Sequence, residues 1–234
     1  GSNHEDRRMK IALCPQPLYP LGLDGALAAA RRLGADAIEL PVDTNSPLVD
    51  LDGLLREGAA PLTAALQRHG LALSALSIHQ EGQLILGPHH ADTDAIFAGS
   101  AAQKVAFGVE RVRKAGRLAR QLGVDTVISF VGCEDYARFF PWPDAQGFER
   151  MWPVFRERLL PILDEFHAAG VRFAHEPHPK QMVYNTETAL ESVAVLDAHP
   201  AWMFNLEPAN LLLAGVDPVD FVAALGERVV HVHA

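Results

Sequence analysis

Seven apolar segments of strand length recur along the chain, each followed by polar residues, and stretches of helical character separate them. The segments are KIALCP (10–15), DAIELPV (36–42), LALSALSIH (71–79), VDTVISFVG (124–132), VRFAHEPHP (171–179), WMFNLEPAN (202–210) and VVHVHA (229–234). Strands that alternate with helices predict βαβ units and a parallel sheet. Because two parallel strands need a long crossover between them, this alternation restricts the chain to an α/β architecture.

Helical patterns fill the intervals between these segments. The expected helices cover 24–33, 50–69, 101–122, 148–169, 186–198 and 217–225. Four of them end at a glycine shortly before the next strand: Gly34, Gly70, Gly123 and Gly170. Glycine is typical at that position because it adopts a left-handed conformation without strain. Asp24 and Asp217 are expected to cap helices, and Pro61 is expected to break or restart the helix over 50–69.

The repeated strand–helix unit predicts a (β/α)8 barrel that forms a single domain over residues 9–234. The chain holds seven such units, so strand eight and its helix are expected to be missing from it. The polar segment 1–8 lacks the apolar run of a secretory signal and is interpreted as a tag or a disordered N-terminus. An open doubly wound sheet is the rival, but its G-x-G-x-x-G fingerprint does not follow the first strand.

Composition excludes several functions. A net charge of −9 argues against a nucleic-acid-binding surface. The sequence has no apolar run of the ~18–20 residues that a membrane span needs. Two cysteines do not make a disulfide framework, which fits a reducing cytoplasm. Neither the charge nor the pI identifies a substrate, and a homodimer is an open alternative to a monomer.

Three residues suited to metal binding stand at consecutive strand ends. Glu176 ends the apolar run of the fifth segment, Glu207 takes the equivalent place in the sixth, and His233 lies near the end of the seventh. Parallel strands present their carboxyl ends on one face, where barrels of this type build their sites. A buried carboxylate such as Glu176 needs a proton, an Arg or Lys partner, or a metal. One imidazole with carboxylates suits Mn²⁺, Mg²⁺, Co²⁺ or Zn²⁺.

Other polar residues at these strand ends are candidates for substrate contacts. His178 lies two residues after Glu176 and is a candidate for orienting substrate or carrying a proton. The candidates for binding sugar hydroxyls are Glu39, His79, Gln83, Asn210 and His231. Asn205 lies two residues before Glu207, on the same side of the sixth strand. Each of these has an alternative role in capping a loop or pairing across the barrel. Two long loops, 80–100 and 133–147, follow strand ends and are expected to line the same opening.

The stretches VRFAHEPHP, FNLEPANLLLAGVDPVDFVAALGERVVHVHA and, more weakly, LSIHQEGQLILGP resemble the xylose-isomerase-like TIM barrels, specifically the sugar phosphate isomerase/epimerase group. In that family a Glu, an Asp, a His and a second Glu from strands five to eight bind one divalent metal. The resemblance implies that Glu176 and His233 are ligands and that Glu207 replaces the Asp. Asn210 then replaces a His that contacts substrate, and the fourth ligand has no counterpart in this chain.

The resemblance implies a metal-dependent isomerase or epimerase that acts on a sugar or keto-sugar through an enediolate. In that mechanism Glu176 is also a candidate base. A lyase or dehydratase is a close alternative, because the same enolate can eliminate a β-substituent. The second hypothesis is a non-catalytic or weakly catalytic sugar-binding barrel with a degraded metal site. A DNA-repair endonuclease is disfavoured by the acidic charge.

Overall fold

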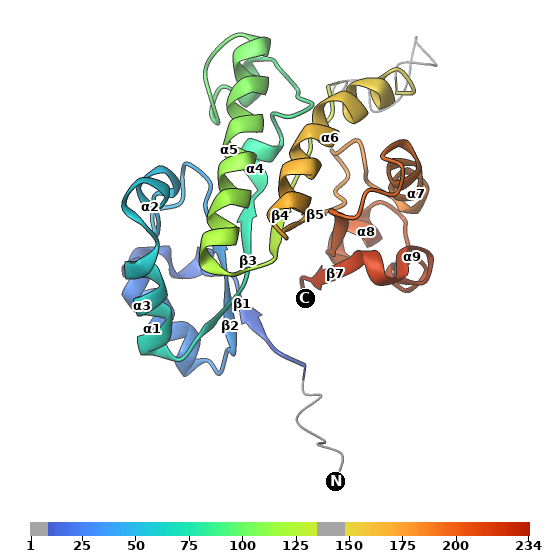
Figure 1. The fold of residues 1–234 in the computed structure, drawn as a ribbon. Coiled ribbons are helices and arrows are strands. Elements are labelled where there is room, and N and C mark those ends of the chain that lie inside the picture. The colour runs from blue at the N-terminus through green and yellow to red at the C-terminus, as the bar shows by residue number, and fades with distance from the viewer. Residues whose placement is uncertain (1–8, 135–147) are drawn as a thin grey trace.

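Seven parallel strands form one curved sheet in the computed structural model, which describes residues 9–134 and 148–234. The strands are β1 (Ala12–Leu13), β2 (Ala37–Pro41), β3 (Ala72–Ile78), β4 (Thr126–Ser129), β5 (Arg172–His175), β6 (Trp202–Leu206) and β7 (Val229–Val232). Each strand pairs with its neighbours in the sequence, in the order β1-β2-β3-β4-β5-β6-β7. The fold is therefore an open TIM-like barrel of seven strands, as the repeats predict (Figure 1).

Helices surround the outside of the sheet (Figure 1). The α-helices are α1 (Gly22–Arg32), α2 (Leu51–Glu57), α3 (Ala60–His69), α4 (His79–Gly82), α5 (Ala101–Leu122), α6 (Met151–Ala168), α7 (Thr186–Val195), α8 (Pro208–Leu213) and α9 (Pro218–Leu225). Short 3₁₀ helices cover Gln16–Leu21, Ala91–Thr93 and Gly226–Arg228. No helix of the described residues has the length and apolar character needed to cross a lipid bilayer.

Local capping explains several helix boundaries. Ser100 and Gln103 form a reciprocal capping box at the start of α5, and Gly123 ends that helix in the left-handed region at φ 69°. Asp217 caps α9 by accepting a hydrogen bond from the Val219 amide at 2.8 Å. These signals lie within a few residues of each boundary, so they are visible in the sequence.

Some boundaries differ from the expected ones. Asp24 lies inside the first turn of α1, whose N-cap is Leu21, and its carboxylate pairs instead with Arg68 and His69 of α3. The segment 202–210 is strand only as far as Leu206, since its last residues begin α8. The pattern over 50–69 divides into α2 and α3, with the second helix beginning one residue before Pro61.

The main core lies between the sheet and the surrounding helices, and its cluster of buried side chains extends from Ala26 to Leu225. Trp202 and Phe155 are fully buried there, with their rings 5.6 Å apart in an edge-to-face arrangement. A second, smaller cluster of Ala75, Ile128 and Ala174 has Val230 packed against it. Burial on this scale holds the strand ends in place, which is what a site assembled from several strands requires.

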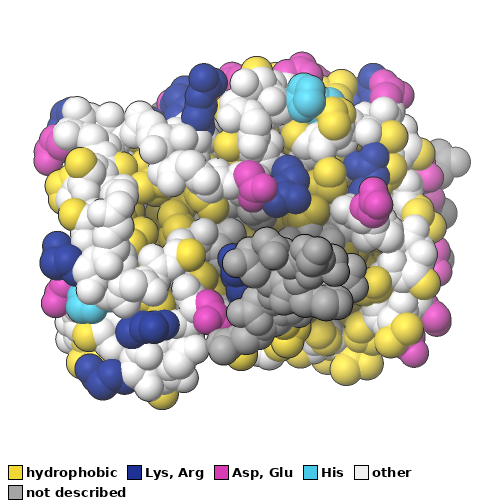
Figure 2. Space-filling view, turned by 60° about the horizontal axis from the view of Figure 1, so that its bottom comes forward, with side chains coloured by type: hydrophobic (Ala, Val, Ile, Leu, Met, Phe, Trp, Pro, Cys, Tyr) yellow, Lys and Arg dark blue, Asp and Glu magenta, His cyan; other side chains and the backbone are white. Residues whose placement is uncertain are grey.

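The surface mixes charges of both signs. Figure 2 shows Lys and Arg side chains interspersed with Asp and Glu on one face, with apolar side chains between them. The large apolar side chains that are most exposed among the described residues are Met9, Leu33, Leu213 and Val219.

Candidate functional site

Carboxylates and imidazoles from four strands meet at the carboxyl end of the sheet. Glu39 belongs to β2, Glu176 follows β5 directly, and Glu207 follows β6 directly. His231 lies in β7, and His233 follows that strand by one residue. The strand register reinforces the arrangement, since Asn205 of β6 is paired with His231. Residues up to 194 positions apart in the sequence are thereby brought into hydrogen-bond contact.

Glu176 is the most highly connected carboxylate of the cluster. It is 6% exposed, and its Oε2 atom accepts hydrogen bonds from Asn205 Nδ2 at 2.9 Å and from His79 Nε2 at 3.1 Å. Its Oε1 atom accepts from Asn210 Nδ2 at 3.1 Å. Nδ1 of His233 lies 3.2 Å from the same Oε2 atom. Imidazole and amide partners therefore compensate this buried carboxylate, and no Arg or Lys of the described chain pairs with it.

His233 joins three carboxylates. Its Nε2 atom lies 2.7 Å from Glu39 Oε2, while its Nδ1 atom lies 3.2 Å from Glu176 Oε2 and 3.5 Å from Glu207 Oε2. Although burial lowers the pKa of His233, the hydrogen bonds with Glu176 and Glu39 and the charges of these two carboxylates raise it to about 10. The ring therefore lies in strongly anionic surroundings, which also favour a metal cation in place of one ring proton.

The two most buried carboxylates of the cluster are held ionised. Burial alone raises the pKa of Glu176, but hydrogen bonds with His233 and His79 lower it well below its usual range. Burial likewise raises the pKa of Glu39, and the hydrogen bond with His233 lowers it overall. Both groups are consequently anionic acceptors at neutral pH, the form in which a carboxylate ligates a metal.

Glu207 has a structural contact as well as a place in the cluster. Its Oε1 atom accepts a hydrogen bond from the Ala209 amide at 3.1 Å, which caps α8. Its Oε2 atom faces His233 Nδ1. One oxygen thus stabilises the helix while the other points into the cluster, so the cap fixes the direction of the carboxylate.

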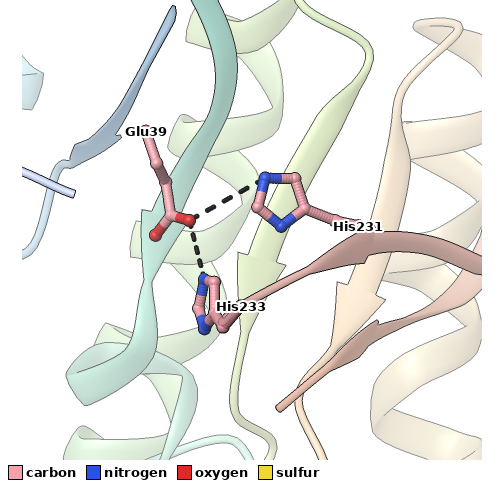
Figure 3. A group of neighbouring side chains, drawn as sticks. All are labelled: Glu39, His231 and His233. Atoms are coloured by element: carbon pink, nitrogen blue, oxygen red, sulfur yellow. Dashed lines mark hydrogen bonds and ion pairs between the residues drawn. The ribbon is translucent and has the colours of Figure 1, made fainter. Parts of the chain in front are cut away.

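The donors of Glu176, Glu207 and His233 lie within 4.8 Å of one another. Direct bonds from a divalent metal to such atoms are ~2.0–2.6 Å long, so the three donors are close enough together for one ion to reach all of them. Glu39, His231 and His233 form a second group that meets the same limit, shown in Figure 3. The two groups share His233, with a different ring nitrogen facing each of them.

His79 and His178 lie beside an aromatic residue near Glu176. The His79 ring contacts Phe130 edge-on at 4.8 Å, and the His178 ring lies 5.3 Å from Phe130. Burial lowers the pKa of His79, but the hydrogen bond with Glu176 raises it overall, whereas burial leaves the pKa of His178 lowered. His178 lies beyond the end of β5, and its Nδ1 atom accepts a hydrogen bond from the Lys180 amide at 3.4 Å.

Gln83 and Asn210 use their amides within the protein. Gln83 Nε2 donates to the Gly87 carbonyl at 3.2 Å, and its Oε1 atom accepts from Gln181 Nε2. Asn210 lies in the first turn of α8 rather than in a loop, because Glu207 caps an unpredicted helix that follows β6 directly. Its amide donates to Glu176, which places it in the cluster.

Asn205 was not among the expected site residues, yet it connects much of the cluster. Its Nδ2 atom donates to Glu176 and lies 3.1 Å from His233 Nδ1, while its Oδ1 atom lies 2.9 Å from His231 Nδ1. The signal that could have identified it is an amide inside an otherwise apolar strand segment. A buried polar side chain needs partners, and Asn205 is fully buried.

The loop over 80–100 begins at the carboxyl end of β3, as expected, with α4 following the strand directly. Its Leu86 amide donates to the Val131 carbonyl beyond β4, so the loop packs on the same end of the sheet. The second expected loop, 133–147, lies mostly outside the described residues, which resume at Phe148.

With this geometry established, comparison with known proteins identifies the family. The family model described as "Xylose isomerase-like TIM barrel" matches residues 27–234, so the chain belongs to that family. A curated relative, the uncharacterized protein YfiH of Bacillus subtilis (strain 168), is 27% identical over 248 residues, covering 96% of this chain and 72% of YfiH.

Two solved structures share the fold. One is the 3-keto-D-glucoside 4-epimerase YcjR from E. coli, with a TM-score of 0.72 and 14% identity over 97% of this chain and 78% of YcjR. Another is the IolI protein with a bound zinc atom, with a TM-score of 0.63 and 17% identity over 96% of this chain and 72% of IolI. At these identities the likeness establishes the architecture alone, and the chemistry of this chain depends on its own residues.

Proposed function

We propose that the protein is a metal-dependent isomerase or epimerase that acts on a sugar or keto-sugar through an enediolate. The observation that carries the proposal is the convergence of Glu176, Glu207 and His233 at the carboxyl end of a xylose-isomerase-like barrel. The epimerase activity of YcjR and the zinc of IolI belong to those proteins, and they support the proposal by analogy.

The donor set fits one divalent metal, which would be Mn²⁺, Mg²⁺, Co²⁺ or Zn²⁺. Glu176, Glu207 and His233 would hold it, with two carboxylates and one imidazole as ligands. Such an ion supplies Lewis-acid polarisation of a sugar carbonyl. The strongly anionic surroundings of His233 favour this occupancy, because a dication replaces the proton that the carboxylates otherwise hold there.

The protein's own residues would then move protons and orient the sugar. His178 has a lowered pKa, so its imidazole is neutral at physiological pH. Release of the 3.4 Å contact with the Lys180 amide would free Nδ1 to accept the proton next to the carbonyl. Glu176 is the second candidate base. Return of that proton to the opposite face gives epimerisation, and return to the neighbouring carbon gives isomerisation.

The remaining residues of the site are candidates for substrate contacts. His79 and Asn210 contact Glu176, and His231 contacts Asn205. Their polar groups would turn from these partners to sugar hydroxyls. Gln83 would act through the 80–100 loop, since its amide is directed to Gln181 and Gly87. A small sugar in the cytoplasm remains the expected partner.

A second candidate is a sugar-binding barrel without turnover. One observation favours it: Oε1 of Glu207 is engaged in capping α8, which leaves a single oxygen of that carboxylate for a metal. A barrel of this kind would bind a metal only weakly but would still bind the sugar.

Hydrogen exchange with solvent distinguishes the two candidates. The protein, loaded in turn with each of the four metals, is incubated with a panel of keto-sugars in D₂O, and deuterium at the carbon next to the carbonyl is followed by NMR. If the protein is an isomerase or epimerase, deuterium incorporation should depend on the metal, and His178→Gln should reduce it by ~10²-fold or more. Sugar binding without incorporation for any metal would favour the non-catalytic barrel.

A further inference from the structure

The two nitrogens of the His233 ring have different surroundings. Nε2 faces one carboxylate, with Glu39 Oε2 at 2.7 Å (Figure 3). Nδ1 faces the candidate metal ligands Glu176 and Glu207. The two sides of the ring are therefore not equivalent, and the proton and the metal have separate places on it.

We propose that Glu39 is a positioning residue that keeps a proton on Nε2 of His233, so that Nδ1 is the nitrogen offered to the metal. This inference rests on the proposed metal site and assigns to Glu39 a contact with protein rather than with a sugar hydroxyl. An ionised carboxylate is only an acceptor, so a contact of 2.7 Å requires a hydrogen on Nε2. A metal-bound histidine commonly donates its other N–H to such a partner.

Asn205, which contacts the Nδ1 side of the His233 ring, also favours hydrogen on Nε2. Its Nδ2 atom must face Glu176, because the carboxylate accepts and cannot donate. That amide orientation places an N–H 3.1 Å from His233 Nδ1, so Asn205 disfavours hydrogen at that nitrogen. When a metal replaces one hydrogen of the protonated ring, the contacts with Glu39 and Asn205 both favour its loss from Nδ1 and its retention on Nε2.

The position of Glu39 in the fold suits this task. The side chain is 3% exposed and belongs to β2, so its direction is held by the sheet rather than by a loop. A buried carboxylate without a donor is costly, and the short contact from His233 supplies one. A firmly held acceptor restricts the ring to one rotation and one protonation pattern.

A second metal between Glu39, His231 and His233 is the competing explanation. It requires His233 to lose its Nε2 proton while Nδ1 ligates the first ion. Nδ1 of His231 lies 2.9 Å from Asn205 Oδ1, so that nitrogen is the donor and Nε2 is left 3.9 Å from Glu39 Oε2. The 2.7 Å separation between Glu39 and His233 has hydrogen-bond length, which favours the single-ion arrangement.

The test uses Zn²⁺, which is diamagnetic, with the metal-stripped protein. Wild type is compared with Glu39→Gln, which retains an acceptor without charge, and with Glu39→Leu, which retains volume only. Asp43→Asn is the matched control, because Asp43 is a buried carboxylate just beyond the same strand whose hydrogen bonds are with the Gln80 amide and Glu81 rather than with His233. Calorimetry gives affinity and stoichiometry, and long-range ¹H–¹⁵N spectra of the zinc-loaded protein show which ring nitrogen of His233 carries hydrogen.

Wild type is expected to bind one Zn²⁺ with hydrogen on Nε2. Glu39→Gln should weaken binding ~10-fold with Nε2 still protonated, and Glu39→Leu should weaken it ~100-fold with loss of the single protonation pattern. Asp43→Asn should bind as wild type does. Wild-type affinity and an unchanged Nε2 signal in Glu39→Leu would overturn the proposal.

Two other outcomes also decide the matter. Two Zn²⁺ ions per wild-type chain and one in Glu39→Leu would make Glu39 a ligand of a second ion, which contradicts the positioning role. A wild type that binds no Zn²⁺ would overturn the metal site together with this proposal. Zinc binding with the expected Nε2 signal but no sugar turnover with any metal would leave the role of Glu39 standing while the proposed activity fails.

Discussion

Asp43 and Glu81 form a buried pair of carboxyl groups beside the candidate site, and replacing Asp43 by Asn should stabilise the protein in a pH-dependent way. Asp43 is 7% exposed and Glu81 is fully buried. Burial, followed by the hydrogen bond and the charge of Glu81, raises the pKa of Asp43 to about 7. Oε2 of Glu81 is buried without a hydrogen-bond partner among the described residues, and a proton shared with Asp43 would supply Glu81 with a further donor.

The sign follows from proton uptake on folding. The pKa of Asp43 is 3.8 for the free side chain and about 7 in the folded protein, so between these values the native state binds the extra proton. Stability therefore falls as pH rises from about 4 to about 7. Asn is neutral at every pH and can donate to Glu81, so it avoids this cost.

The expected gain grows by about 1.4 kcal/mol for each pH unit within that window. Between pH 5 and pH 8 about two units of the window are crossed, so Asp43→Asn should gain about 3 kcal/mol more at pH 8 than at pH 5. That difference is large beside a typical domain stability of about 5–15 kcal/mol.

Urea unfolding in EDTA at pH 5 and pH 8, followed by tryptophan fluorescence with Trp202 as a buried reporter, measures this difference. Asp52→Asn is the control. The pKa of Asp52 is lowered, chiefly by its hydrogen bond with Lys114, so its replacement should give no gain at pH 8. An Asp43→Asn gain that is equal at the two pH values, or a loss at pH 8, would refute the shared-proton account.

Two further substitutions test the site and its support. Glu207→Asp should bind Mn²⁺ at least as tightly as wild type, since it keeps the carboxylate and restores the family's residue type, whereas Glu207→Ala should lose at least ~10-fold in affinity and the α8 cap worth about 1 kcal/mol. Equal calorimetric affinity in all three proteins would show that Glu207 is not a ligand. Gly82→Ala should lower stability by about 1–3 kcal/mol, because a new Cβ meets the Ser129 hydroxyl and the Phe130 carbonyl below α4. Unchanged thermal unfolding of that variant would contradict the close packing of α4 on β4.

Much of the fold follows from local signals in the sequence. The helix over 101–122 has the predicted bounds, because a capping serine and a terminal glycine mark its ends. The first strand is shorter than the expected 10–15, since β1 pairs only with β2 and its ladder covers Ala12–Leu13. The extent of an edge strand depends on its partner, which a single segment does not specify.

The short helices α4 and α8 escaped prediction. Each follows a strand without an intervening loop, so the apolar run and the helix share residues. Asp217 with Pro218 is a recognisable helix start, and Glu207 with Pro208 is the same arrangement with a residue that rarely caps. The weaker cap explains why the sequence predicts a loop rather than a helix at Asn210.

Part of the candidate site is likewise predictable from the sequence, and part of it is not. That Glu176, Glu207 and His233 lie together follows from their equivalent places at consecutive strand ends. The contact between Glu39 and His233 does not, because 194 residues separate them and β2 is not a neighbour of β7 in the strand order. Only the curvature of the sheet brings these strands together, and no local pattern encodes it.

The location of a bound metal tests the central claim most directly. A crystal of the protein grown with Mn²⁺ and measured for anomalous scattering would show the ion itself. The account predicts one peak at ~2.0–2.6 Å from a carboxylate oxygen of Glu176, a carboxylate oxygen of Glu207 and Nδ1 of His233. An absent peak at saturating Mn²⁺, or a peak held by Glu39 and His231 instead, would contradict it.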